Sequence, residues 1–167
     1  MEWLPAHLPP AGPVRVVHGD YRLDNMIIAA DAPKVLAVLD WELSTLGDPL
    51  ADFAYHCMSW HIPPGQFRGI GGLDLDQLGI PSEAQYLQKY LKRTGKPAVD
   101  PSHWDFYMAY NLFRIAAILQ GILKRVVDGT AASAHARDAG SRAKPMAELG
   151  WQMVEKMHRG KSSGRAA

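Results

Sequence analysis

Apolar positions near the start of the chain form short runs, and those further along recur at helical spacing. The first run, Val14 to Val17, predicts a short strand. Two more runs, Met26 to Ala30 and Val35 to Leu39, are separated by a turn sequence at 31–34 that contains Asp and Pro. Residues 26–40 therefore predict a β-hairpin.

The pattern after residue 40 is typical of helices joined by loops. Asp48 followed by Pro49 predicts a helix start, with Asp48 as the N-cap and Pro49 at the first helical position. Ser82 begins another helix, and Gly95 ends it. The Gly- and Pro-rich stretch 61–81 between them predicts a long loop. The expected helices cover about 49–60, about 82–94, a long stretch from 102 through 126, and about 134–157, the last interrupted by Gly and Pro.

The long helix that starts at Ser102 carries the clearest core signal. Its apolar residues recur at alternating spacings of four and three, which places them on one face of a helix. The residues predicted for this buried face are Met108, Leu112, Ile115, Leu119, Ile122 and Val126.

The two ends of the chain differ from the middle. Prolines at positions 5, 9, 10 and 13 interrupt the opening segment, so we expect Trp3 and Leu4 to be the frayed end of an element that begins upstream. The segment 159–167 contains basic residues, Gly and Ser but no acids, and predicts a flexible basic tail. The expected organisation is one domain over 1–158 followed by this tail.

Composition excludes several classes of protein. Of the 167 residues, 47% are apolar and 21% are charged, and the formal net charge is +1, which is ordinary for a soluble globular protein. The only basic run without acids is the C-terminal tail, so the sequence does not indicate nucleic-acid binding. The strongest apolar stretch, Ile115 to Leu123, is far shorter than the ~20 residues that span a bilayer. The single cysteine, Cys57, cannot form an internal disulfide, so we expect a cytoplasmic protein. Charge and the short apolar stretch lead us to expect no nucleic-acid or membrane partners.

The polar loop after the first strand carries the candidate chemistry. It reads His18-Gly19-Asp20-Tyr21-Arg22-Leu23-Asp24-Asn25, and the hairpin returns Asp40 to the side of Asn25. An amide oxygen and a carboxylate suit Mg²⁺, which shares its remaining positions with water and substrate phosphates. Asp20 can accept or orient a hydroxyl proton. Phosphoryl transfer needs mainly such positioning and charge neutralisation.

This pattern resembles the aminoglycoside phosphotransferase and choline kinase-like family, in the branch found fused to or beside acyl-CoA dehydrogenases. The five-residue interval from Asp20 to Asn25 matches the protein-kinase catalytic loop, and Asp40-Trp41-Glu42 takes the place of the metal-binding Asp segment. The run from Leu43 to Asp52 is also similar to that branch. The resemblance implies an α+β, protein kinase-like C-terminal lobe, mainly helical, with a small β-hairpin that carries the metal site.

The resemblance also implies roles for single residues. Asp20 is expected to be catalytic, and Asn25 and Asp40 are expected to bind Mg²⁺ and, through it, the co-substrate ATP. The acceptor is expected to be a small hydroxylated molecule. For His18 we favour a packing and hydrogen-bonding role over that of a general base.

Other polar residues keep two interpretations. Glu42 lies either beside the metal ligands or in a pair with a basic side chain. Arg22 contacts either a substrate or a local carboxylate. Asp24 is expected to be solvated, and Asp48 and Asp52 are interpreted as a helix cap and an internal brace.

Members of the family also have an N-terminal lobe that covers the nucleotide. The seventeen residues before His18 cannot form it, so we expect that lobe to be absent here and the uncovered face to promote self-association. The alternatives to an active kinase lobe are a non-catalytic binding or assembly module and a Mg²⁺-dependent phosphohydrolase. Between Tyr55 and Val127, eight Lys or Arg face five Asp or Glu, which disfavours a polycationic aminoglycoside as the acceptor.

Overall fold

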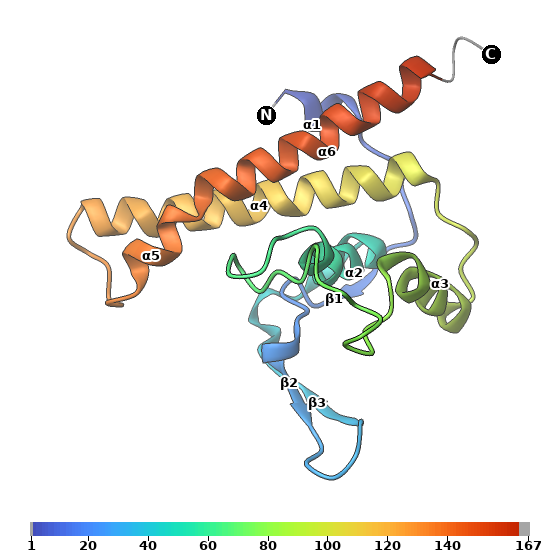
Figure 1. The fold of residues 1–167 in the computed structure, drawn as a ribbon, viewed down its shortest axis with the longest axis horizontal. Helices are drawn as coiled ribbons and strands as arrows, with labels where there is room; N and C mark the ends of the chain where they lie inside the picture. Colours follow the sequence, from blue (N-terminus) through green and yellow to red (C-terminus); the bar gives the residue numbers. More distant parts are fainter. Residues whose placement is uncertain (1, 164–167) are drawn as a thin grey trace.

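Two long helices form the body of the molecule. The structure is a computed structural model that describes residues 2–163. Helix α4 (Pro101–Val127) lies beside α6 (Ala143–Ser163), and the short α5 (Ala136–Ser141) connects them (Figure 1). Helix α2 (Pro49–Cys57) packs against α4, and α3 (Glu83–Thr94) lies next to α2. The fold is mainly helical with small antiparallel sheets, as the sequence predicts.

Helix α4 supplies the centre of the core. It begins at Pro101, one residue before the predicted start at Ser102. Asp100 caps its N-terminus, because Asp100 Oδ1 accepts the Ser102 N–H at 2.7 Å and Pro101 takes the first helical position. The predicted apolar face is confirmed: four of its residues are buried and the other two are half-buried. The buried Asn111 also donates from Nδ2 to the Ala51 carbonyl at 2.9 Å, which joins α4 to α2.

Helix α4 is, within the described part of the chain, long and apolar enough to cross a membrane by length and composition. Core helices of soluble proteins pass the same test. Here α4 contacts α2, α5 and α6 and buries ten of its side chains, so it is the core helix of this fold.

The helix predicted over 134–157 is two helices, with the break at Arg142. Pro145 explains the break. It lacks an N–H and fits within the first turn of α6, whereas in a continuous helix its ring would clash with the carbonyl four residues earlier. Helix α6 continues through residues 159–163, where the sequence predicts the start of a flexible tail. The rest of that tail, 164–167, lies outside the described residues.

Helices α2 and α3 begin at the predicted caps. Asp48 Oδ1 accepts the Leu50 N–H at 2.9 Å, and Ser82 forms a reciprocal capping box with Gln85. Gly95 ends α3 in the left-handed conformation, with φ of 64°. These local signals place both helices with respect to the core.

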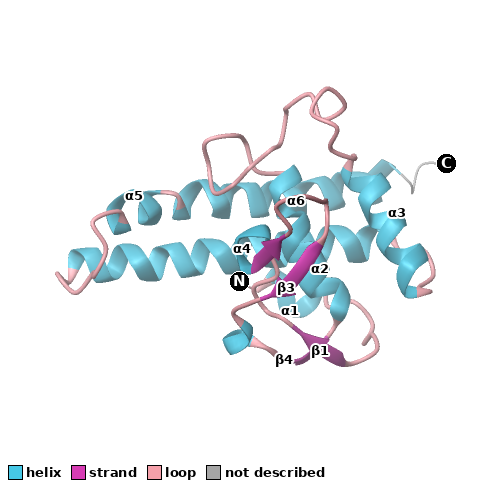
Figure 2. Ribbon diagram, turned by 90° about the horizontal axis from the view of Figure 1, so that it is seen from below, coloured by secondary structure: helices cyan, strands magenta, loops and turns pink. Residues whose placement is uncertain are grey.

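Figure 2 shows two separate two-stranded sheets beside the helices. Strands β2 (Met26–Ile28) and β3 (Val35–Val38) form the predicted hairpin, which projects away from the helices (Figure 1). Strand β1 (Arg15–Val17) pairs with β4 (Thr45–Gly47), a strand that the sequence does not predict. Strand β4 is only three residues long, and its partner lies about 30 positions away, so no local pattern marks it.

The opening segment is better ordered than its prolines suggest. Residues 3–6 form the one-turn helix α1 (Trp3–Ala6). The Trp3 ring stacks on His7 and Phe106, with centroids 4.2 and 6.0 Å apart, and its Nε1–H donates to His158 at 2.9 Å. The expectation of a frayed end is therefore wrong, because aromatic packing on α4 and α6 holds the turn.

Helix α2 also holds the polar loop that follows β1. The Asp52 carboxylate accepts the backbone N–H groups of His18 at 2.7 Å and Gly19 at 2.9 Å, one on each oxygen. The predicted internal brace is thus confirmed. It joins the first turn of α2 to the start of the loop.

We predict that Asp52→Asn destabilises the protein, because the amide offers one oxygen and turns its NH₂ group toward a backbone donor. The expected loss is about 1–3 kcal/mol in the free energy of unfolding, measured by urea titration. Asp138→Asn is the matched control, since the Asp138 side chain is 69% exposed and forms a surface ion pair with Arg142. Equal unfolding curves for the two variants would contradict the brace.

Candidate active site

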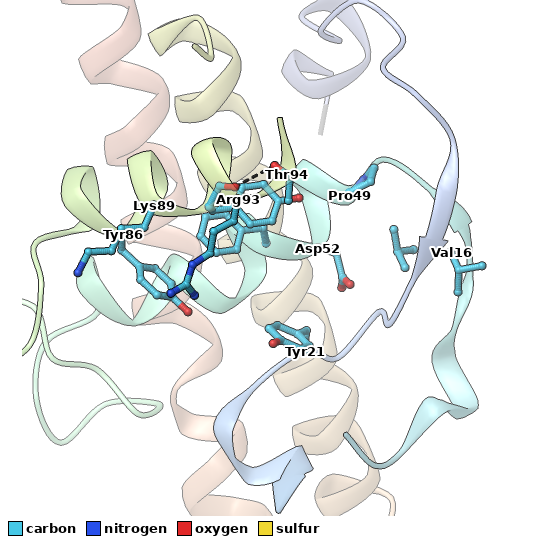
Figure 3. Close-up of a pocket in the computed structure, with 11 residues that line it drawn as sticks. Val16, Tyr21, Pro49, Asp52, Tyr86, Lys89, Arg93 and Thr94 are labelled. Atoms are coloured by element: carbon cyan, nitrogen blue, oxygen red, sulfur yellow. Dashed lines mark hydrogen bonds between the residues drawn. The ribbon is translucent and has the colours of Figure 1, made fainter. Parts of the chain in front are cut away.

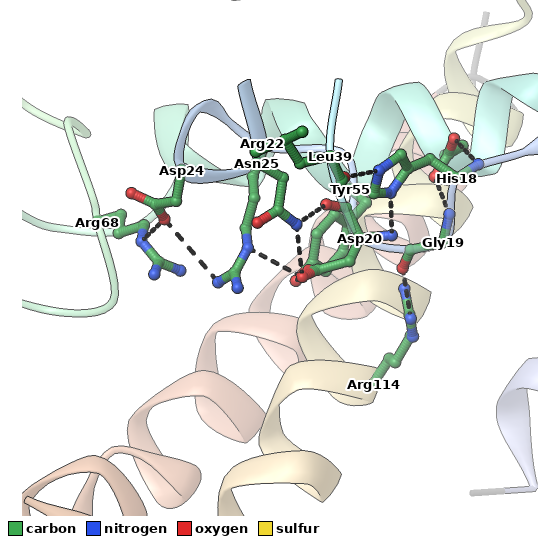
Figure 4. A network of polar contacts seen from close by, with 11 residues as sticks. His18, Gly19, Asp20, Arg22, Asp24, Asn25, Leu39, Tyr55, Arg68 and Arg114 are labelled. Carbon is green, nitrogen blue, oxygen red and sulfur yellow. Dashed lines mark hydrogen bonds and ion pairs between the residues drawn. The ribbon is translucent and has the colours of Figure 1, made fainter. Parts of the chain in front are cut away.

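The polar loop 18–25 lies between β1 and the hairpin and contacts both α2 and α4 (Figure 4). His18 is buried at its start, and its Nε2–H donates to the Leu39 carbonyl at 2.7 Å. Its Nδ1 accepts the Asp20 N–H at 3.2 Å. These two bonds assign the neutral tautomer with the proton on Nε2. One ring nitrogen thus links the loop to the residue after β3, and the other bonds within the loop, which favours the structural role expected of His18.

The Asp20 carboxylate is held by three side chains. Its Oδ1 accepts the Tyr55 hydroxyl at 2.6 Å, and its Oδ2 accepts Asn25 Nδ2 at 3.0 Å. Arg22 Nε lies 2.9 Å from the same Oδ2 in an ion pair. The side chain is only 16% exposed. Because a carboxylate oxygen has two acceptor positions, Oδ1 retains one for a further donor.

Asn25 is oriented by Asp20. Its Nδ2 also donates to the Asp20 backbone carbonyl at 2.9 Å, so the amide nitrogen is used twice by the same residue. Among the described residues, nothing donates a hydrogen bond to the amide oxygen Oδ1. A buried residue with this unused oxygen fits a magnesium ligand.

The hairpin brings Asp40 next to Asn25, as predicted. Met26 pairs with Val38, and the Leu39 N–H donates to the Asn25 carbonyl at 2.8 Å, so Asp40 follows directly after this contact. Asp40 adopts the left-handed conformation, with φ of 65° and ψ of 51°, which Asp tolerates better than most residues. Its exposed carboxylate forms no hydrogen bond or ion pair with the described residues, and it is free to bind a cation.

The donor set fits Mg²⁺ shared with phosphates rather than a metal enclosed by protein. Within residues 2–163 there is no cluster of three or more His, Cys, Asp or Glu side chains that could hold a metal ion. One amide oxygen and one carboxylate are the usual protein share of a magnesium site completed by water and phosphate oxygens. Asn25 and Asp40 would hold the ion.

Two residues that support Asp20 were missed by sequence reasoning. Tyr55 follows Asp52 by one helical turn, so the two share a face of α2, and this spacing is a signal that could have identified Tyr55. Burial, and then the hydrogen bond to Asp20, raise the pKa of Tyr55 above its ordinary value, which keeps the hydroxyl a donor. Arg114 of α4 donates to the Gly19 carbonyl at 2.6 Å and lies over the Tyr55 ring at 5.0 Å. Its 95-residue separation from Gly19 gives no local signal.

The structure gives different outcomes for the other polar residues, Glu42, Arg22 and Asp24. Glu42 is exposed in the turn after Asp40 and pairs with no basic side chain among the described residues. Arg22 pairs with local carboxylates, namely Asp20 and, at 3.9 Å, Asp24. Asp24 is therefore ion-paired rather than simply solvated.

Two pockets flank the loop. One, of about 400 Å³, lies between β1, α2 and α3 and is lined by aromatic rings, Asp52, Lys89 and Arg93 (Figure 3). The other, of about 280 Å³, is lined by Arg22 and Tyr55 together with residues of α2 and the loop 61–81. Because Arg22 and Tyr55 both contact the Asp20 carboxylate, the second pocket adjoins the candidate catalytic group.

Comparison with known proteins gives one consistent family. Residues 1–110 match the Phosphotransferase enzyme family. The chain is 48% identical over 158 residues to acyl-CoA dehydrogenase family member 10 of Mus musculus and 33% identical over 156 residues to acyl-CoA dehydrogenase family member 11 of Homo sapiens. Each alignment covers 93% of this chain.

A crystal structure from Ralstonia eutropha JMP134, named a "putative aminoglycoside phosphotransferase", is 62% identical with a TM-score of 0.87. The match covers 93% of this chain and 47% of that one, while the two curated relatives are covered over 15% and 20% of their lengths. This chain thus spans about half of the solved chain and a fifth or less of these curated relatives. Together, the family match over residues 1–110 and the close structural agreement establish that the chain belongs to the phosphotransferase enzyme family.

Proposed function

We propose that this chain is the catalytic C-terminal lobe of an ATP- and Mg²⁺-dependent phosphotransferase that acts on a hydroxyl group of a small molecule. One observation carries the proposal. Asn25 donates its amide to the Asp20 carboxylate and leaves its own oxygen unused, next to the hairpin end that bears Asp40. A proton acceptor and a magnesium site are thereby linked through a single side chain.

The proposed chemistry follows from this arrangement. Tyr55 and Asn25 fix the Asp20 carboxylate, whose free Oδ1 position accepts the hydrogen bond of the acceptor hydroxyl and orients its oxygen. As that oxygen bonds to the γ-phosphorus of ATP, the bond from phosphorus to the ADP oxygen breaks, and the proton passes to Asp20. Mg²⁺ at Asn25 and Asp40 would supply neutralisation of phosphate charge.

We predict that Asp20→Asn lowers the rate of phosphoryl transfer, because the amide cannot take the proton. The expected loss is about 10²- to 10⁴-fold in kcat. The assay uses this chain and a chimera that adds the part of the Ralstonia chain outside the match, with ATP, Mg²⁺ and a panel of small alcohols. Asp31→Asn, in the exposed hairpin turn, is the control and should leave the rate unchanged.

The same assay separates the two functional classes. If Asp20→Asn and the parent transfer phosphate equally, the role of Asp20 is wrong. If a folded parent that binds ATP and Mg²⁺ transfers no phosphate to any alcohol, the chain is a non-catalytic binding or assembly module. A cytoplasmic location and the lack of nucleic-acid and membrane partners stay predictions.

We also propose that the chain self-associates through the apolar surface of its two sheets. Large side chains exposed there include Val16, Ile27, Leu36 and Leu46, and exposed apolar surface favours association. Sedimentation velocity should show species larger than a monomer, and Leu36→Lys should shift them toward monomer. Ile118→Lys, on the exposed side of α4, is the matched control. A parent that stays monomeric at high concentration would contradict this surface.

A further inference from the structure

The pocket next to Asp20 has an apolar interior. Its walls come from the 3₁₀ turn Met58–Trp60 that follows α2 and from the loop 61–81, and they include Met58, Trp60, Ile62, Phe67, Ile70 and Ile80. None of its lining residues is a carboxylate. The hydrocarbon part of a ligand would therefore be buried favourably here, and a polycation would find no opposite charge in the lining.

Two arginines stand at the edge of this pocket and share one aspartate. Arg68 Nε and Arg22 Nη1 both contact Asp24 Oδ2, with 3.9 Å between Arg22 and that oxygen. Figure 4 shows Arg68, Asp24, Arg22 and Asp20 in a row. The Asp24 side chain is 50% exposed and is not part of the pocket lining, so it can leave the two guanidinium groups at small cost.

The donors of this row are incompletely used. Arg22 Nε is buried and lies near Asp20, but its N–H is not aligned for a hydrogen bond with any described residue. A guanidinium has five N–H donors in a fixed fork that matches a carboxylate. Arg22 and Arg68 thus have unused donor capacity at the mouth of an apolar pocket.

The loop that supplies Arg68 is strained and fixed. Phe67 and Arg68 are consecutive non-glycine residues with positive φ, 21° and 57°. Backbone hydrogen bonds hold the loop on either side, since Gly69 N–H donates to Gln66 at 2.8 Å and Ile70 N–H donates to Ser59 at 2.8 Å. Such strain persists only where the surrounding structure enforces it, and it is concentrated at binding sites.

We infer that Arg68 and Arg22, both of which line the pocket, bind a carboxylate group of the acceptor in exchange for their contacts with Asp24. The apolar part of the acceptor fills the pocket, and its hydroxyl reaches Asp20. The acceptor is then a hydroxylated carboxylic acid with an apolar body. This inference rests on the proposed function for the hydroxyl, whereas the carboxylate subsite is tested by binding alone.

The test is calorimetric titration of the chain with two matched probes in the absence of nucleotide and metal. The probes are 4-(hydroxymethyl)benzoate and the neutral 1,4-benzenedimethanol, which share the ring and a hydroxyl and differ in the carboxylate. The acid should bind about tenfold more tightly than the diol, as expected for charge-assisted hydrogen bonds. Arg68→Gln should abolish this preference, while Arg15→Gln, an exposed arginine of β1, should preserve it.

A second variant distinguishes a ligand site from a structural ion pair. Asp24→Asn removes the competing carboxylate, so it should strengthen binding of the acid several-fold and leave the diol unchanged. Equal affinities of the two probes, no saturable binding of the acid, or weaker acid binding by Asp24→Asn would each overturn the subsite. Because no phosphoryl transfer is measured, failure of the catalytic proposal leaves this result interpretable.

Discussion

The two hydrogen bonds from the His18 and Gly19 amides to the Asp52 carboxylate determine where the candidate site lies. They fix the start of the loop to α2, and α2 is joined to α4 through Asn111 and through the Tyr107 hydroxyl, which donates to Asp48. The packing of α2 against α4 in the core therefore sets the position of the site. Removal of Asp52 would leave two donors without their acceptor at the point where the loop leaves β1.

Further contacts then arrange the loop step by step. Arg114 binds the Gly19 carbonyl on the other side of the same peptide segment, and the His18 ring connects the loop to Leu39. Asp20 then meets Tyr55 from α2 and Asn25 from its own loop. Charge is balanced locally, because the arginine donors near Asp20 are themselves shared with Asp24. Asp24 is the more exposed of the two carboxylates in this row, since its side chain is 50% exposed and that of Asp20 is 16% exposed.

Local signals in the sequence predicted much of this arrangement. The hairpin, the Asp48 cap, the apolar face of α4 and the Asp52 brace all depend on residues close in sequence or on a recognised motif. Strand β4 was missed because three residues carry too little pattern, and its pairing with β1 is a long-range contact. Arg114 was missed for the same reason. Asp40 lies between the end of the hairpin and the turn that follows, and its residue type alone does not predict its left-handed backbone.

We propose that Asn25 and Asp40 hold the Mg²⁺ that serves Asp20. Asn25 and Asn111 are the two asparagines of the chain, so their side-chain amide signals provide a direct comparison by NMR. Mn²⁺ added with ATP should broaden the Asn25 signal at a lower metal concentration than the Asn111 signal, because paramagnetic relaxation falls steeply with distance. Asp40→Ala should weaken that selectivity. Equal broadening of both asparagines, or broadening of neither, would contradict the account.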